Sequence, residues 1–172
     1  MSTAVHREPT GDGITAAALT DEVWRQLAKA SFAVVSQITP TGGPRSSGVL
    51  YVVVGRMMYV AVAEDSWKAV HLAANGAVAV TVPVRRGGIL SLLFPIPPAT
   101  ISFHGAATVH PVSSLEGSPV ARKLERLLPP ERRDGYRIVA IRPEGQFLTY
   151  GVGVPLMQMR VPARARRRVP VE

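Results

Sequence analysis

The sequence contains no cysteine, fewer acidic than basic residues and no long apolar run. Without cysteine there can be no disulfide framework, no thiolate nucleophile and no cysteine-ligated zinc site. No stretch reaches the ~18 apolar residues that span a membrane, and residues 1–13 are polar and charged where a secretory signal would be apolar. We therefore expect a protein of the reducing cytoplasm that is neither exported nor anchored.

The chain of 172 residues is long enough for one well-buried core and leaves little room for a second domain. Hydrophobic residues make up 47% and charged residues 19%, a composition typical of globular proteins and not of disordered ones. We predict a flexible leader over residues 1–18, one domain over 19–158 and a basic, arginine-rich tail over 159–172.

The formal net charge of +8 is concentrated at the C-terminal end. Residues 160–172 hold five arginines against one glutamate, which leaves +4 of the total in this segment. Such a run can bind polyphosphate backbones, but it lacks the interleaved aromatic residues that stack on single strands. The favoured interpretation is a solvated tail or a tail that lies on a partner subunit, and nucleic-acid binding is the minor alternative.

Apolar periodicity predicts a mostly β protein. A helix is expected from a cap at Thr20, and further helices over 67–75, ended by a left-handed Gly76, and over 114–128. Runs of β-branched residues bounded by Gly and Pro predict strands over 32–38, 46–54, 57–62, 77–82, 99–109, 136–142 and 146–152, with Gly105 at a bulge or close approach. About six to seven strands joined by short hairpins favour a closed or nearly closed antiparallel barrel.

Residues 89–98 are too rich in proline for a helix or central strand and too apolar for a free loop. We interpret them as a lid or a subunit contact. An apolar lid predicts a hydrophobic or planar small-molecule substrate.

The order of elements, together with segments 43–51, 58–62 and 65–69, resembles the cofactor-binding half of the split-barrel proteins related to pyridoxamine phosphate oxidase. Residues 20–155 are covered by this resemblance, more weakly at 103–106 and 138–143. It implies a split β-barrel that binds FMN, with a deazaflavin coenzyme as the alternative and haem as a less favoured one. It also implies a homodimer with the cofactor at the subunit interface, and hydride transfer to or from a small substrate.

A phosphate-binding site is predicted at Ser66 and Lys68. A helix that begins after Ser66 presents unpaired N–H groups and the positive end of its dipole, to which a hydroxyl and an ammonium are added. A plain helix cap is the alternative, but a lysine two residues after the cap lies at the unfavourable end of the dipole. The resemblance places Lys68 at the family's phosphate-binding lysine.

Arg45, Ser46 and Ser47 begin the second predicted strand, where the resemblance implies contacts with phosphate and ribityl oxygens. A solvated hairpin arginine is an equal alternative for Arg45. By the two-residue period of a strand, Val49 and Tyr51 share a face with Ser47 and would wall the ring system.

Three residues depart from the family's pattern. Ala61 and Val62 stand where the family often has an aromatic or small residue followed by threonine, and Trp67 stands where a phosphate-binding arginine is common. These departures leave a different tricyclic ligand open. True pyridoxamine phosphate oxidation is not expected, because residues 168–172 do not match the family's Arg-Leu-Ala-Pro ending.

His104 is the one histidine placed to suggest chemistry, as a metal or haem ligand. No second ligand lies at a suitable spacing, so a structural role is the favoured interpretation. No Ser-His-acid set or carboxylate pair is visible, and no catalytic residue is assigned. The rival to an oxidoreductase is a non-catalytic split barrel that binds or sequesters a cofactor, haem or lipid-like ligand.

Overall fold

The computed structural model describes residues 15–85, 99–128 and 135–172. The strands in it are β1 (Phe32–Ile38), β2 (Pro44–Val54), β3 (Met57–Ala63), β4 (Ala77–Val84), β5 (Ala99–Pro111), β6 (Tyr136–Tyr150) and β7 (Arg166–Pro170). The helices are α1 (Ala16–Lys29), α2 (Trp67–Ala74), α4 (Pro119–Leu127) and α5 (Pro162–Ala165), with 3-10 turns η1 (Val112–Leu115) and η3 (Leu156–Arg160). Among these residues no helix is long and apolar enough to cross a membrane.

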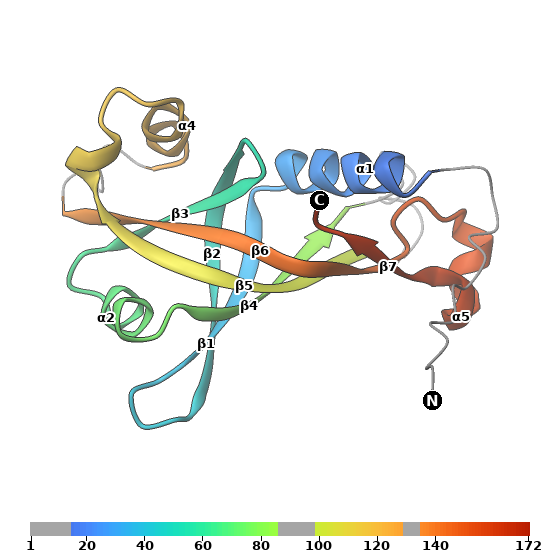
Figure 1. Cartoon of the computed structure of the whole chain (residues 1–172), viewed down its shortest axis with the longest axis horizontal. Helices are drawn as coiled ribbons and strands as arrows, with labels where there is room; N and C mark the ends of the chain where they lie inside the picture. The colour runs from blue at the N-terminus through green and yellow to red at the C-terminus, as the bar shows by residue number, and fades with distance from the viewer. Residues whose placement is uncertain (1–14, 86–98, 129–134) are drawn as a thin grey trace, which may run out of the picture.

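Six of the strands form a closed antiparallel barrel, as the sequence predicts. Their order is β3-β2-β1-β4-β5-β6, and β3 pairs with β6 to close the ring (Figure 1). β3 covers only residues 136–141 of β6, and β7 pairs with residues 146–150 of the same strand. β7 is thus added to the barrel along the part of β6 that β3 leaves uncovered.

Buried and more exposed residues alternate along β1, β3 and β4. β1 has the predicted bounds, and Ala33, Val35 and Gln37 are its buried positions. β-branched residues suit the half-buried surface of a sheet, and the Gly and Pro residues between the runs form the hairpins.

The two strands predicted over 136–142 and 146–152 are one bent strand, β6. Ser102 of β5 pairs with Leu148 of β6, and His104 pairs with Glu144. Two steps along β5 thus correspond to four along β6, so β6 carries two extra residues at this place. Gly145 lies in the extra stretch with a φ of 69°, which glycine adopts without strain. The chain therefore bends at Gly145 where the sequence suggested a turn between two strands.

Gly105 confirms the predicted close approach of two strands. A Cβ atom there would lie 2.3 Å from the carbonyl oxygen of Arg142 on β6. Only a residue without a side chain lets β5 and β6 approach this closely.

The start of the first helix differs from the prediction. Thr15, not Thr20, caps α1, and its side chain accepts a hydrogen bond from the Ala18 N–H. Thr20 is buried instead, and its hydroxyl lies within hydrogen-bond distance of the carbonyl oxygens of Ala16 and Pro170, at 3.1 and 3.0 Å. Residues 15–18 of the predicted leader therefore belong to the cap and first turn of α1, and the rest of that leader lies outside the described residues.

Gly76 does not end α2 in a left-handed conformation, so that prediction was wrong. Asn75 is the C-cap, and Gly76 is needed for close packing because a Cβ would lie 2.4 Å from the carbonyl oxygen of Ala107. The backbone N–H of Ala107 donates to the Gly76 carbonyl at 2.7 Å. The end of α2 is thereby fixed to β5.

The single helix predicted over 114–128 is two elements. η1 ends before Gly117, whose φ is 72°, and α4 then begins with Ser118 as its cap and Pro119 in its first turn. α4 packs on the outside of β2 and β3. The predicted stop at residues 129 and 130 lies outside the described residues.

The arginine-rich tail was predicted to be solvated or to lie on a partner, and residues 166–170 are instead strand β7. Val169 and Val171 are buried in the core, while Arg166 and Arg168 are exposed. The indole N–H of Trp24 on α1 donates to the carbonyl oxygen of Val171 at 3.1 Å. This segment is part of the fold because its valines complete the packing between α1 and the barrel.

Candidate functional site

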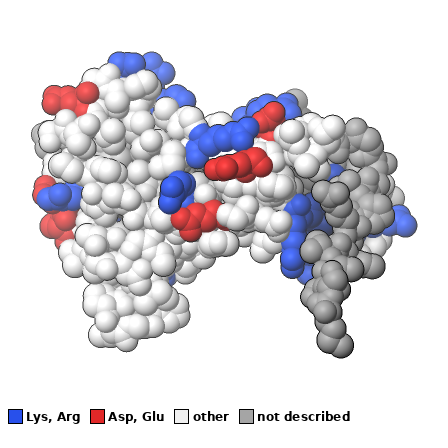
Figure 2. Space-filling view, in the orientation of Figure 1, with Lys and Arg blue, Asp and Glu red and all other residues white. Residues whose placement is uncertain are grey.

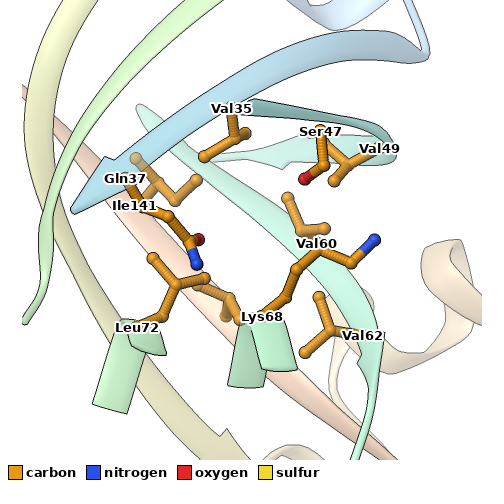
Figure 3. A pocket seen from close by; sticks show the side chains of 10 residues that line it. Val35, Gln37, Ser47, Val49, Val60, Val62, Lys68, Leu72 and Ile141 are labelled. Carbon is orange, nitrogen blue, oxygen red and sulfur yellow. The ribbon is translucent and has the colours of Figure 1, made fainter. Parts of the chain in front are cut away.

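A small cavity lies at the end of the barrel that α2 covers (Figure 3). Its volume is about 10 Å³, room for roughly one water molecule. Four strands and α2 supply its walls, which are mostly aliphatic: Val35, Gln37, Ser47, Val49, Val60, Val62, Lys68, Leu72, Val139 and Ile141.

Ser66 caps α2, as predicted. Its hydroxyl oxygen accepts a hydrogen bond from the Ala69 N–H at 3.3 Å, and the hydroxyl donates to the Ala63 carbonyl at 2.6 Å. The first N–H groups of the helix, on Trp67 and Lys68, have no acceptor within the helix. They form the positive end of the helix dipole beside the cavity.

Lys68 lies one turn before Leu72 on α2, and both side chains line the cavity. Among the described residues no carboxylate lies within ion-pair distance of Lys68. Nearby, Glu64 is bound by Arg137, and Asp65 is exposed at the surface. Lys68 is half-buried, and its ammonium lies 5.9 Å from the centre of the Trp67 ring, so its charge is not neutralised by an ion pair.

Arg45 and Trp67 lie together outside the cavity. The guanidinium carbon of Arg45 is 4.1 Å from the centre of the indole ring of Trp67, a cation–π contact. The ring of His71 is 5.5 Å from the same indole. A phosphate contact by Arg45 would have to form from this stacked position.

Three of the strand residues that were predicted to bind the cofactor line the cavity together with Lys68: Ser47, Val49 and Val62. Ser46 is on the outer face, where its hydroxyl is 2.7 Å from that of Ser36. Ala61 is also outside, packed against the cluster around α4. These two residues do not line the cavity.

The side chain of Tyr51 points to the predicted face of β2, but it lies deeper in the barrel than the cavity. It is 1% exposed, and its hydroxyl donates to the carbonyl oxygen of Leu27 on α1 at 2.8 Å. Burial raises the pKa of the Tyr51 phenol above its ordinary value. Tyr51 thus anchors α1 to the barrel and is not a wall of the cavity.

Gln37 lines the cavity and was not predicted from the sequence. The residue is 3% exposed, and its amide nitrogen Nε2 is buried without a hydrogen-bond partner. The signal was present, because Gln37 continues the buried series of Ala33 and Val35 at the two-residue period of a strand.

His104 is exposed on β5. Within residues 15–85, 99–128 and 135–172, no group of three His, Asp or Glu side chains could hold a metal ion. The apolar segment 89–98, predicted to be a lid, lies outside the described residues.

The cavity cannot enclose a tricyclic ring, since it holds about one water-sized atom. Its lining nevertheless fits the oxygen atoms of a flavin-type cofactor, because Lys68 and Gln37 line it and no carboxylate does.

No protein-family model and no curated protein sequence matches the chain. Solved structures do match. An F420 reductase is 18% identical over 72% of this chain and 93% of its own, with a TM-score of 0.54. A candidate pyridoxamine 5′-phosphate oxidase from Listeria innocua is 16% identical over 73% and 94%, with a TM-score of 0.56. The haem storage protein HutZ from Vibrio cholerae is 12% identical over 78% and 96%, with a TM-score of 0.60.

The chain therefore has the fold of the split barrels that are similar to pyridoxamine phosphate oxidase, as the sequence resemblance implied. At these identities the likeness is one of fold, and folds of this kind carry more than one activity.

Proposed function

We propose that this protein is a cytoplasmic oxidoreductase that uses FMN, or alternatively a deazaflavin coenzyme, to transfer a hydride to or from a small, largely apolar or planar substrate. The observation that carries the proposal is the Lys68 ammonium at the N-terminal end of α2, which forms no ion pair among the described residues and lies beside an apolar barrel mouth. An anionic group is stabilised there by both the ammonium and the helix dipole.

The residues divide into an anion-binding end and an apolar wall. Lys68, the N–H groups that follow Ser66, and Arg45 would hold the phosphate. Ser47 would bind a polar group of the cofactor, and Val49 and Val62 would contact the ring. The cofactor, when bound, supplies the hydride chemistry, and the protein orients it and excludes water.

A second copy of the chain is the surface that would cover the ring. The outward positions of β1 and β4 carry no charged residue, and Phe32 and Leu50, which are paired across β1 and β2, are 45% and 49% exposed. Figure 2 shows little charge on the lobe formed by α2 and the β1–β2 hairpin. We therefore place the cofactor at the interface of a homodimer.

Non-catalytic binding of haem or a lipid-like ligand is the second candidate, favoured by the structural likeness to HutZ. The visible spectrum of the purified protein separates the two. Flavin absorption supports the oxidoreductase, whereas a Soret band supports haem storage.

The test is a titration of FMN and of a deazaflavin coenzyme into the protein and its Lys68→Ala variant. Loss of a charge-assisted contact of ~1.5–3 kcal/mol should weaken binding roughly 10- to 150-fold. Lys29→Ala, an exposed lysine at the end of α1, is the matched control and should bind as the parent does. Equal affinity of Lys68→Ala and parent, or no binding of either compound by the parent, contradicts the proposal.

A further inference from the structure

We propose that Gln37 is a specificity residue that donates a hydrogen bond from Nε2 to an oxygen atom of the bound ligand. This inference rests on the proposed function, since it concerns the same barrel mouth. It starts from an unusual feature of the described structure, a side chain that is 3% exposed and whose amide donor has no partner.

The position of Gln37 is set by the sheet and not by side-chain freedom. Its backbone pairs with Val78 of β4 on one side and with Arg45 of β2 on the other. The two-residue period of β1 then directs the side chain into the barrel after Ala33 and Val35. Figure 3 shows its amide pointing into the cavity between β1 and α2.

A buried donor without a partner destabilises a folded protein, and an aliphatic residue at this position would avoid that cost. The neighbouring wall residues are valines and isoleucine, so the barrel could accommodate such a residue. A glutamine here is explained if a ligand supplies the missing acceptor.

The surroundings of the amide indicate what that acceptor is. Lys68 adds a positive charge and Ser47 a hydroxyl, and no carboxylate lines the cavity. The volume of about 10 Å³ admits a single oxygen-sized atom. The partner is thus one acceptor oxygen, neutral or anionic, at the edge of a ligand whose body stays outside.

The oxygen could belong to the cofactor's phosphate or to a carbonyl of its ring, and two ligands distinguish these sources. FMN carries both groups, whereas riboflavin has the ring without the phosphate. Gln37→Met keeps the length of the side chain and removes the donor, and it should bind FMN at least tenfold more weakly than the parent. An equal loss with riboflavin identifies the ring carbonyl, and a loss confined to FMN identifies the phosphate.

Gln37→Glu is the second variant, and it replaces the donor by a carboxylate that repels the ligand's oxygen. It should bind FMN more weakly than Gln37→Met does. Ser46→Ala, on the outer face of the neighbouring strand, is the matched control and should bind as the parent does. Urea unfolding of each ligand-free variant shows whether it is folded before the titration.

The outcome is decided by the ratio of affinities. If the parent binds FMN and the folded Gln37 variants bind it equally well, the role of Gln37 is overturned while the proposed function stands. If the parent binds neither FMN nor a deazaflavin coenzyme, the proposed function fails and this inference fails with it.

Discussion

Removal of residues 169–172 should strongly destabilise the protein, because β7 and the residue after it complete the core. Val169 and Val171 are 1% and 8% exposed. Burial of a valine contributes about 1.5–3 kcal/mol, so the two contribute roughly 3–6 kcal/mol. The deletion also removes the carbonyl acceptors of Thr20 and Trp24, each contact worth about 1 kcal/mol. A loss of at least about 5 kcal/mol is comparable to the whole stability of a typical domain.

Urea unfolding followed by tryptophan fluorescence measures this loss, since the indole of Trp24 packs edge-on against Phe147 at 5.3 Å. The matched control is the double variant Arg166→Ser with Arg168→Ser, which changes exposed side chains of the same strand. It should shift the free energy of unfolding by no more than about 0.5 kcal/mol. A truncated protein as stable as the parent would show that the C-terminal segment is a free tail, and the packing argument would be refuted.

Two further predictions concern the supports of the site. Burial raises the pKa of Tyr51, so the folded state holds the neutral phenol. The free energy of unfolding should be insensitive to this group below pH ~10 and should fall as the pH rises above that value. The Tyr51→Phe variant should lack this fall. Parallel pH profiles of the two proteins in urea unfolding would contradict this. Gly76→Ala should cost about 1–3 kcal/mol, since its Cβ meets the Ala107 carbonyl oxygen at 2.4 Å, whereas Gly43→Ala has its nearest neighbour at 3.4 Å and should be tolerated. Equal stability of the two alanine variants in thermal unfolding would argue against the close contact.

The barrel could be predicted from the sequence where its signals are local. β1 to β4 are runs of β-branched and apolar residues, the β1–β2 and β2–β3 hairpins are marked by Gly and Pro, and the bounds of the four strands agree with the prediction within a few residues. The cap at Ser66 was likewise readable from a short motif.

β7 was not predicted, because the interactions that stabilise it are with residues far away in the sequence. Its arginines dominate the composition, and only the positions of Val169 and Val171 indicate a strand, one that becomes stable by pairing with β6 and packing on α1. Tyr51 shows the same limit, since periodicity gave its face correctly but could not give its depth in the barrel.

Closure of the barrel by β3 and β6 has a consequence for how the molecule is assembled. Met58 pairs with Ile141, 83 positions later (141 − 58), and contacts between such distant residues slow folding. The same pairing brings Val60 and Val62 to the cavity beside Val139 and Ile141. We expect the cavity to form late, and a fragment that stops before residue 136 would lack one of its walls altogether.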